Sequence, residues 1–106
     1  MPHFLVVGLD GTDAQAPNRR QAARQAHLAK AAADQAAGVL LYAVAQLNEQ
    51  GHMVGSTMVL NLPSLAAVQA WLAQEPYQQQ GVWQQVQVHP AQVPPAFCPP
   101  VGTVAL

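Results

Sequence analysis

The order of strand-like and helical segments in this sequence predicts an α+β protein with the ferredoxin-like β-α-β-β-α-β arrangement and a four-stranded antiparallel sheet. Three observations carry that prediction. Four short stretches have the apolar runs or the period-two alternation of strands. Two longer stretches have small or apolar residues at helical spacing. Turn residues separate these segments in the order that the split βαβ pattern requires.

The first strand and the first helix are predicted at residues 3–9 and 18–38. The strand (HFLVVGL) is apolar on both faces, which predicts a central position in the sheet. The Asp-Gly turn chemistry of residues 10–17 ends it. We expect Asn18 to be the N-cap of the helix and Gly38 to end it in the left-handed conformation.

The helix at residues 18–38 has two unlike faces, and we expect its alanine face to lie against the sheet. At about 100° per residue, polar side chains gather on one stripe and alanines on the opposite one. Alanine is small enough to let the helix pack close to the strands. The polar stripe holds Arg20, Arg24, His27, Ala31 and Asp34, and the alanine stripe holds Ala22, Ala26, Ala29, Ala33 and Ala36.

Basic residues are concentrated at the beginning of this helix, where Arg19, Arg20 and Arg24 occupy the first two turns. The N-terminal end of a helix already carries partial positive charge, so each misplaced cation costs roughly 0.3–1 kcal/mol. Either solvent screens these charges, or an anion or a carboxylate lies beside them. The second alternative points to an anion site built on Arg20 and Arg24. We expect Arg19, Lys30 and Asp34 to be solvated.

The middle of the chain is predicted to form a hairpin and a second helix. Residues 39–46 and 52–62 pair as antiparallel strands across a turn at residues 48–51. Ser64 is the expected N-cap of a helix at residues 65–74.

The last strand, at residues 82–89 (VWQQVQVH), alternates and should be half-buried. We expect Val82, Val86 and Val88 on one side and Trp83, Gln85 and Gln87 on the other. The chain then divides into a domain at residues 1–90 and an extended proline-rich tail at residues 91–106. The reason is that five of the nine prolines fall within residues 90–100.

Composition excludes several classes of function. Four Lys and Arg residues cannot neutralise the phosphates of a nucleic acid, and the longest apolar run, residues 38–45, is too short to span a bilayer. The single cysteine, Cys98, excludes an internal disulfide framework, and the histidines lack the spacing of a metal site, so we expect no metal and no cofactor. With 8% charged residues and a net charge of −1, the surface favours association, so we expect an oligomer. Because the sequence shows no signal peptide, membrane span or disulfide framework, we expect a cytoplasmic location.

Several short motifs occur in the order and spacing of one protein family. An Arg-x-x-His-Leu element lies at residues 24–28, a Gly-Ser-Thr element at 55–57, and an acid-Pro-Tyr turn at 75–77. A Val-x-Val-x-Pro strand follows at residues 86–90. Over residues 3–90 the chain resembles the YciI-like (YCII-related) family of small bacterial proteins.

The resemblance implies a fold, a site and a class of reaction. The fold would be a dimeric α+β barrel, in which two ferredoxin-like subunits pair their sheets around a pocket. The site would consist of a histidine and an acid, matched here by His27 and by Glu75, where the family usually has aspartate. Two other departures are Gln25 in place of a proline and residues 44–46 in place of an Ala-Gly-Pro turn. Members with assigned chemistry look like lyases acting on substituted ring compounds, for example by removing chloride.

The candidate catalytic residues are His27, Glu75 and Asp10. A neutral imidazole exchanges a proton near neutral pH, and a carboxylate beside it fixes its tautomer. Glu75 takes this role from the resemblance, and Asp10 is the alternative acid because it ends a central strand. Without the resemblance, His27 and Glu75 are interpreted as solvated polar residues and Asp10 as a turn former. The choice between the two acids stays open.

Four further residues are candidates for binding a substrate. Arg20 and Arg24 would hold an anionic group, or else neutralise one of the two candidate acids. Ser56 and Tyr77 would line the pocket, or else support the structure.

The function that these residues favour is general acid–base chemistry on a small anionic or ring-containing organic molecule, with a lyase reaction suggested by the resemblance. The alternative is a non-catalytic dimeric module that binds a small molecule or a protein, in which His27 is incidental. We expect a homodimer in both cases.

Overall fold

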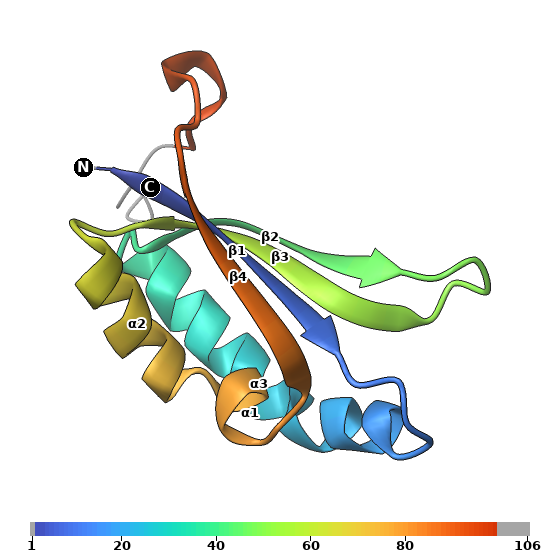
Figure 1. Ribbon diagram of the computed structural model, residues 1–106. Coiled ribbons are helices and arrows are strands. Elements are labelled where there is room, and N and C mark those ends of the chain that lie inside the picture. The colour runs from blue at the N-terminus through green and yellow to red at the C-terminus, as the bar shows by residue number, and fades with distance from the viewer. Residues whose placement is uncertain (1, 100–106) are drawn as a thin grey trace.

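A computed structural model describes residues 2–99, and its α-helices all lie on one face of a four-stranded antiparallel sheet (Figure 1). The strand order is β2-β3-β1-β4. In chain order the elements are β1 (His3–Asp10), α1 (Ala16–Ala36), β2 (Leu40–Leu47), β3 (Met53–Asn61), α2 (Leu65–Gln74), α3 (Pro76–Gln79), β4 (Trp83–Ala91) and the 3₁₀ turn η1 (Pro95–Phe97). The ferredoxin-like α+β fold predicted from the sequence is confirmed.

Most local signals in the sequence correctly place the elements. β1 pairs with β3 on one side and β4 on the other, so its predicted central position is confirmed. Gly38 has a φ of 78°, and the Ser64 hydroxyl accepts a backbone hydrogen bond of 3.1 Å, both as predicted. The N-cap predicted at Asn18 is wrong. The helix begins at Ala16 because Pro17, which has no N–H, fits a first turn where none is needed.

α1 lies on the sheet with the face opposite to the one predicted. Its buried residues are Ala16, Arg20, Ala23 and His27. Arg20 and His27 can be buried because each finds a carboxylate partner inside the fold, and Ala23 between them lets the helix approach. The alanine stripe is exposed: Ala22, Ala26, Ala29, Ala33 and Ala36.

A β-bulge in β4 sets the direction of a tryptophan side chain. The register with β1 shifts after Leu9, so that Asp10 pairs with Trp83 and Gln84 is an extra residue. Trp83 thereby turns to the helix side, where it is 4% exposed. A Cβ on Gly8 would lie 2.4 Å from its indole ring. The prediction that Trp83 points away from the valines of this strand is wrong, because the alternation breaks at the bulge.

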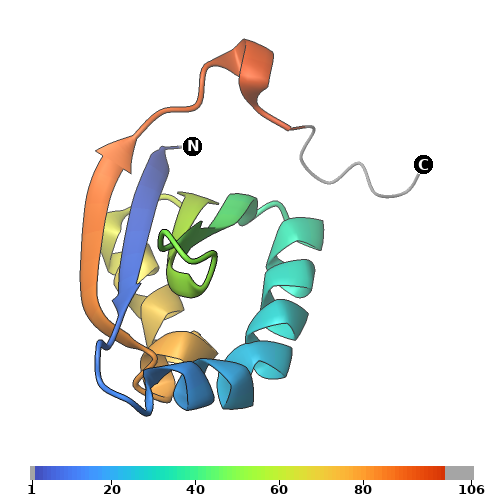
Figure 2. The same cartoon turned by 90° about the vertical axis from the view of Figure 1, so that its right-hand side faces the viewer.

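The core lies between the sheet and the helices, and within residues 2–99 no helix covers the other side of the sheet (Figure 1 and Figure 2). The core residues are Phe4, Val6, Ala23, Leu40, Met58, Leu60, Val68, Trp71, Tyr77, Val82 and Trp83. We call the uncovered side the open face. By register it carries His3, Leu5, Val7, Leu9, Tyr42, Val44, Gln46, Thr57, Val59, Asn61, Gln85, Gln87 and His89, none of which is an acid, a lysine or an arginine.

The proline-rich tail predicted at residues 91–106 begins at the end of β4, which runs to Ala91. Residues 100–106 lie outside the described residues. Residues 92–99 have no regular structure apart from η1. Three hydrogen bonds hold this segment to the sheet: the backbone N–H of Val93 (2.9 Å) and the Gln92 side-chain amide (3.4 Å) donate to His3 Nδ1, and the Tyr42 hydroxyl donates to the Phe97 carbonyl.

Candidate functional site

His27 and Glu75 form a buried pair between α1 and the turn that joins α2 to α3. His27 Nδ1 lies 2.9 Å from Glu75 Oε2, and the two side chains are 9% and 0% exposed. The same carboxylate oxygen accepts the backbone N–H of Tyr77 (2.9 Å), which makes Glu75 the N-cap of α3 and holds it in place. The sequence left two acids open as the partner of this histidine, and Glu75 is the one in contact.

This pairing assigns the tautomer of the histidine. A carboxylate accepts hydrogen bonds, so Nδ1 of a neutral His27 carries the proton and Nε2 has the free lone pair. Within residues 2–99, Nε2 has no hydrogen-bond partner and is not among the fully buried polar atoms. Nε2 is therefore the ring nitrogen that can take a proton from another molecule.

Tyr77 lies between His27 and Arg20 and fixes the plane of the imidazole. The rings of His27 and Tyr77 are stacked, with 3.8 Å between centroids and 8° between planes. The Arg20 guanidinium carbon lies 4.8 Å from the Tyr77 centroid. Arg20 and His27 are about 10 Å apart along the helix, so the phenol ring fits between them. Burial raises the pKa of the Tyr77 phenol above its ordinary value of 10.0, so the ring is uncharged at neutral pH.

Arg20 is neutralised by Asp10 at the end of β1. Its Nη1 lies 2.9 Å from both carboxylate oxygens, and the two side chains are 9% and 5% exposed. Its Nη2 donates to the Ser56 hydroxyl (3.1 Å) and to the Gly55 carbonyl (3.3 Å), so one guanidinium joins α1 to β1 and β3. Ser56 is itself buried and contacts the arginine. The sequence left two roles open for Arg20, binding an anionic group or neutralising a candidate acid. Its contact with Asp10 is the second of these.

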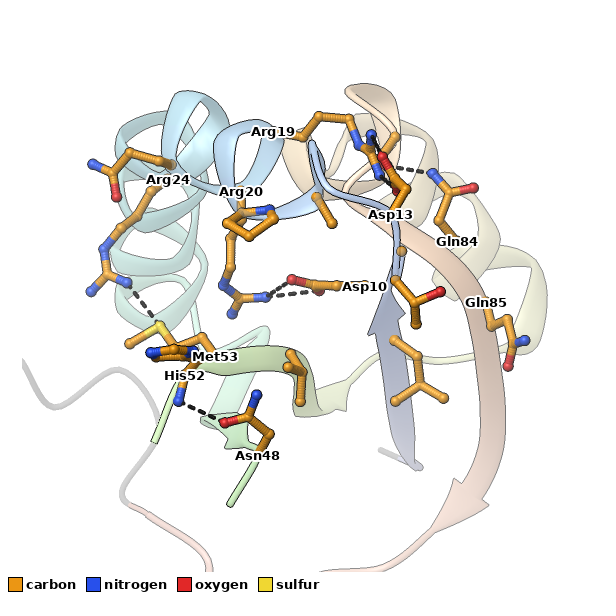
Figure 3. Close-up of a pocket in the computed structure, with 18 residues that line it drawn as sticks. Asp10, Asp13, Arg19, Arg20, Arg24, Asn48, His52, Met53, Gln84 and Gln85 are labelled. Carbon is orange, nitrogen blue, oxygen red and sulfur yellow. Dashed lines mark hydrogen bonds and ion pairs between the residues drawn. The ribbon is translucent and has the colours of Figure 1, made fainter. Parts of the chain in front are cut away.

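An open cleft lies over this ion pair, as Figure 3 shows. Its walls come from the beginning of α1, the loop after β1, the β2–β3 hairpin and the beginning of β4. Arg24 lines the cleft and donates to Met53 Sδ (3.2 Å), and within residues 2–99 it has no carboxylate partner. The lining residues are Leu9, Asp10, Gly11, Thr12, Asp13, Ala16, Pro17, Arg19, Arg20, Gln21, Arg24, Asn48, His52, Met53, Val54, Gly81, Gln84 and Gln85.

The candidate residues divide into two groups around this cleft. Those that line it are Asp10, Arg20 and Arg24; those that lie deeper are His27, Glu75, Ser56 and Tyr77. The two groups touch where the Arg20 guanidinium covers the Tyr77 ring. The structure thus brings all seven candidates into one region, with the arginines toward the cleft and the histidine–acid pair beneath it.

Two ion pairs were missed because the residues were expected to be solvated. Arg19 pairs with Asp13 at 2.6 and 2.9 Å on the rim of the cleft, and these hydrogen bonds lower the pKa of Asp13 from 3.8 to about 2. Asp34 accepts from Lys30 (2.6 Å) and from the Trp71 indole (2.8 Å), which ties α1 to α2. The Arg19–Asp13 pair spans the beginning of the helix, so helical periodicity gives no signal for it.

Neither a metal cluster nor a membrane span is found in the described part of the chain. Among residues 2–99, no three His, Cys, Asp or Glu side chains lie where they could hold a metal ion. No helix in this range is both long enough and apolar enough to cross a membrane.

The ferredoxin-like sheet, the buried histidine–carboxylate pair and the arginine-lined cleft define a class: small α+β proteins with a candidate acid–base site. The chain belongs to the YCII-related family, because the YCII-related domain matches residues 3–92. A search of the curated proteins finds no match.

Two solved structures have a similar fold. One is 5-chloro-2-hydroxyhydroquinone dehydrochlorinase (TftG) from Burkholderia phenoliruptrix AC1100, in complex with 2,5-dihydroxybenzoquinone. It is 19% identical, with a TM-score of 0.74 over 85% of this chain and 93% of that one. The other is a dimeric ferredoxin-like protein of unknown function from Jannaschia sp. CCS1. It is 16% identical, with a TM-score of 0.51 over 88% of this chain and 100% of that one. At these identities the likeness shows the fold.

The ion pair beneath the cleft predicts unequal effects of removing two arginines from the same helix. Arg20→Met leaves Asp10 buried without its partner and should lower the free energy of unfolding by about 3–5 kcal/mol. Arg24→Met is the matched control and should cost no more than about 1 kcal/mol, since Arg24 is partly exposed and has no carboxylate to leave behind. Urea unfolding of both variants measures the difference, and equal losses would contradict it.

Proposed function

We propose that this protein is an acid–base enzyme that acts as a homodimer on a small anionic or ring-containing organic molecule. His27 takes or gives the proton, Glu75 orients the histidine, and Arg24 holds the anionic group of the substrate. A lyase reaction is the favoured class. In that reaction His27 Nε2 removes a proton from the substrate, the electron pair left behind forms a new π bond, and a leaving group departs with its own bonding electrons.

The observation that carries this proposal is the 2.9 Å contact between His27 Nδ1 and Glu75 Oε2, at side chains that are 9% and 0% exposed. The carboxylate keeps the proton on Nδ1 and stabilises the imidazolium that forms when Nε2 takes a second proton. Because the Tyr77 stack also fixes the ring plane, the lone pair of Nε2 has one direction. Such an orientation is what a general base needs.

The charges of the cleft support an anionic substrate. Arg19 and Arg20 are each paired with an aspartate, whereas Arg24 has no carboxylate partner within the described residues. The cleft therefore offers one guanidinium to a ligand. Arg24 precedes His27 by three positions on α1, which puts their Cβ atoms about 5–6 Å apart. A small molecule bound at Arg24 would lie next to the histidine.

In our proposal, the remaining candidates position other side chains of the site. Asp10 and Ser56 hold the Arg20 guanidinium, and Tyr77 holds the imidazole plane, so each is a positioning residue. None of the three needs to touch the substrate.

The comparisons support two parts of the proposal, the ring-containing substrate and the homodimer. TftG is named as a dehydrochlorinase and holds a dihydroxybenzoquinone, and the protein from Jannaschia is described as dimeric. The open face of this chain carries exposed apolar side chains, among them Val44 (60% exposed), and no Asp, Glu, Lys or Arg, so it suits the paired sheets of a dimer. A second copy over that face would also reduce the opening of the cleft, whose rim includes the β2–β3 hairpin.

A non-catalytic binding module is the second candidate function. The observation that favours it is that the cleft is lined by Asp10, Arg20 and Arg24 but not by His27. In that case a small anion binds at Arg24 and no proton moves.

Removal of the histidine should strongly reduce turnover. In a screen of chlorinated and hydroxylated aromatic compounds, followed by chloride release and by absorbance, His27→Ala is expected to reduce kcat/KM about 10²–10⁴-fold, the usual contribution of a general base. Leu28→Ala is the control, because Leu28 is adjacent on the same helix and 49% exposed. Equal turnover by His27→Ala and wild type would remove the histidine from the mechanism. Ligand binding by calorimetry without turnover of any compound would favour the binding module.

Replacement of Arg24 should weaken substrate binding and leave the chemical step almost unchanged. Arg24→Met is expected to raise KM about tenfold to a hundredfold, the cost of losing one charge-assisted hydrogen bond, with kcat changed less than about threefold. Arg24→Lys keeps the charge without the planar guanidinium and should recover part of the loss. Steady-state kinetics with an anionic substrate measure both variants, and an unchanged KM in Arg24→Met would place the anion elsewhere.

A further inference from the structure

We infer that residues 92–98 form an arm for a second copy of this chain, with Phe97 as the side chain that the partner subunit buries. The inference rests on the homodimer proposed above. It goes beyond that proposal by assigning part of the interface to a segment that lies almost entirely outside the YCII-related domain, which ends at residue 92.

The arm is attached on the side of the open face. Val93 N–H donates to His3 Nδ1, and the Tyr42 hydroxyl donates to the Phe97 carbonyl. By register, His3 and Tyr42 both point to the side of the sheet that carries no helix. Figure 1 and Figure 2 show η1 standing beyond the sheet on the side away from the helices. A copy that packs on the open face must therefore meet this segment.

The Phe97 side chain projects from the arm and is not buried by the described residues of its own subunit. Its backbone is held by Tyr42, but its side chain is 70% exposed, more than any other large apolar residue in the described part of the chain. Pro94 and Pro95 precede it and restrict the backbone before binding. A rigid, exposed aromatic residue loses little conformational entropy when a partner covers it, which is typical of an interface anchor.

A second copy is the partner that fits this surface. The open face and residues 92–98 carry no Asp, Glu, Lys or Arg, so the surface can meet itself without repulsion between like charges. A two-fold dimer brings the same patch of each subunit together, and each arm then reaches the partner's sheet in the same way. The exposed apolar residues Tyr42 and Val44 continue the surface from Phe97 along β2.

The test is the dissociation constant of the dimer, measured for the full chain by sedimentation equilibrium. Phe97→Ala is expected to raise this constant at least about tenfold, the loss typical of an interface anchor. Leu65→Ala is the matched control, because Leu65 is an apolar residue, 50% exposed, on α2 at the helical side of the sheet. It should change the constant less than about twofold. Circular dichroism checks that both variants are folded, as expected for exposed positions.

The outcomes separate this inference from the homodimer itself. A wild-type dimer that Phe97→Ala leaves unchanged, or makes tighter, would overturn the arm while the proposed dimer stands. A wild-type chain that stays monomeric at the highest concentration measured would overturn both.

Discussion

The structure depends on the burial of two polar side chains of α1, Arg20 and His27, against carboxylates from other elements. Arg20 meets Asp10 from the end of β1, and His27 meets Glu75 from the turn after α2. Burying such groups alone would cost several kcal/mol, so the helix can adopt this orientation only because both partners are in place. The contacts that fix how the helix packs are therefore the same contacts that arrange the site. A change in either carboxylate should disturb both.

These contacts form a continuous series through the site. Asp10 holds Arg20, Arg20 covers one face of Tyr77, Tyr77 stacks on His27, and His27 binds Glu75. The first members line the cleft and the last members lie beneath it. A substrate that binds at the cleft would thus approach a histidine whose tautomer and plane are already set. In the proposed function, this arrangement would let a small domain with few charges present one oriented base.

The sequence predicted the fold because its signals are local: strand alternation, helical spacing, the Ser64 cap and the left-handed Gly38 each depend on nearby residues. The helix orientation could not be predicted in the same way. Polar side chains ordinarily face solvent, and the partners that reverse this rule for Arg20 and His27 lie 10 and 48 positions away. The predicted direction of the Trp83 side chain was wrong because one bulge residue shifts the alternation of the strand. The family resemblance supplied His27 and Glu75, and only the tertiary structure could choose between Glu75 and Asp10 as the partner.

The central proposal is that Nδ1 of His27 donates a hydrogen bond to Glu75, so that the lone pair of the neutral imidazole lies on Nε2. Long-range ¹H–¹⁵N correlation spectra of the ¹⁵N-labelled protein at neutral pH test it directly, with His27→Gln to assign the signals. We predict the nitrogen shifts of the Nδ1–H tautomer for His27 and their loss in Glu75→Ala. A proton on Nε2 in the wild type, or an unchanged pattern in Glu75→Ala, would contradict the account.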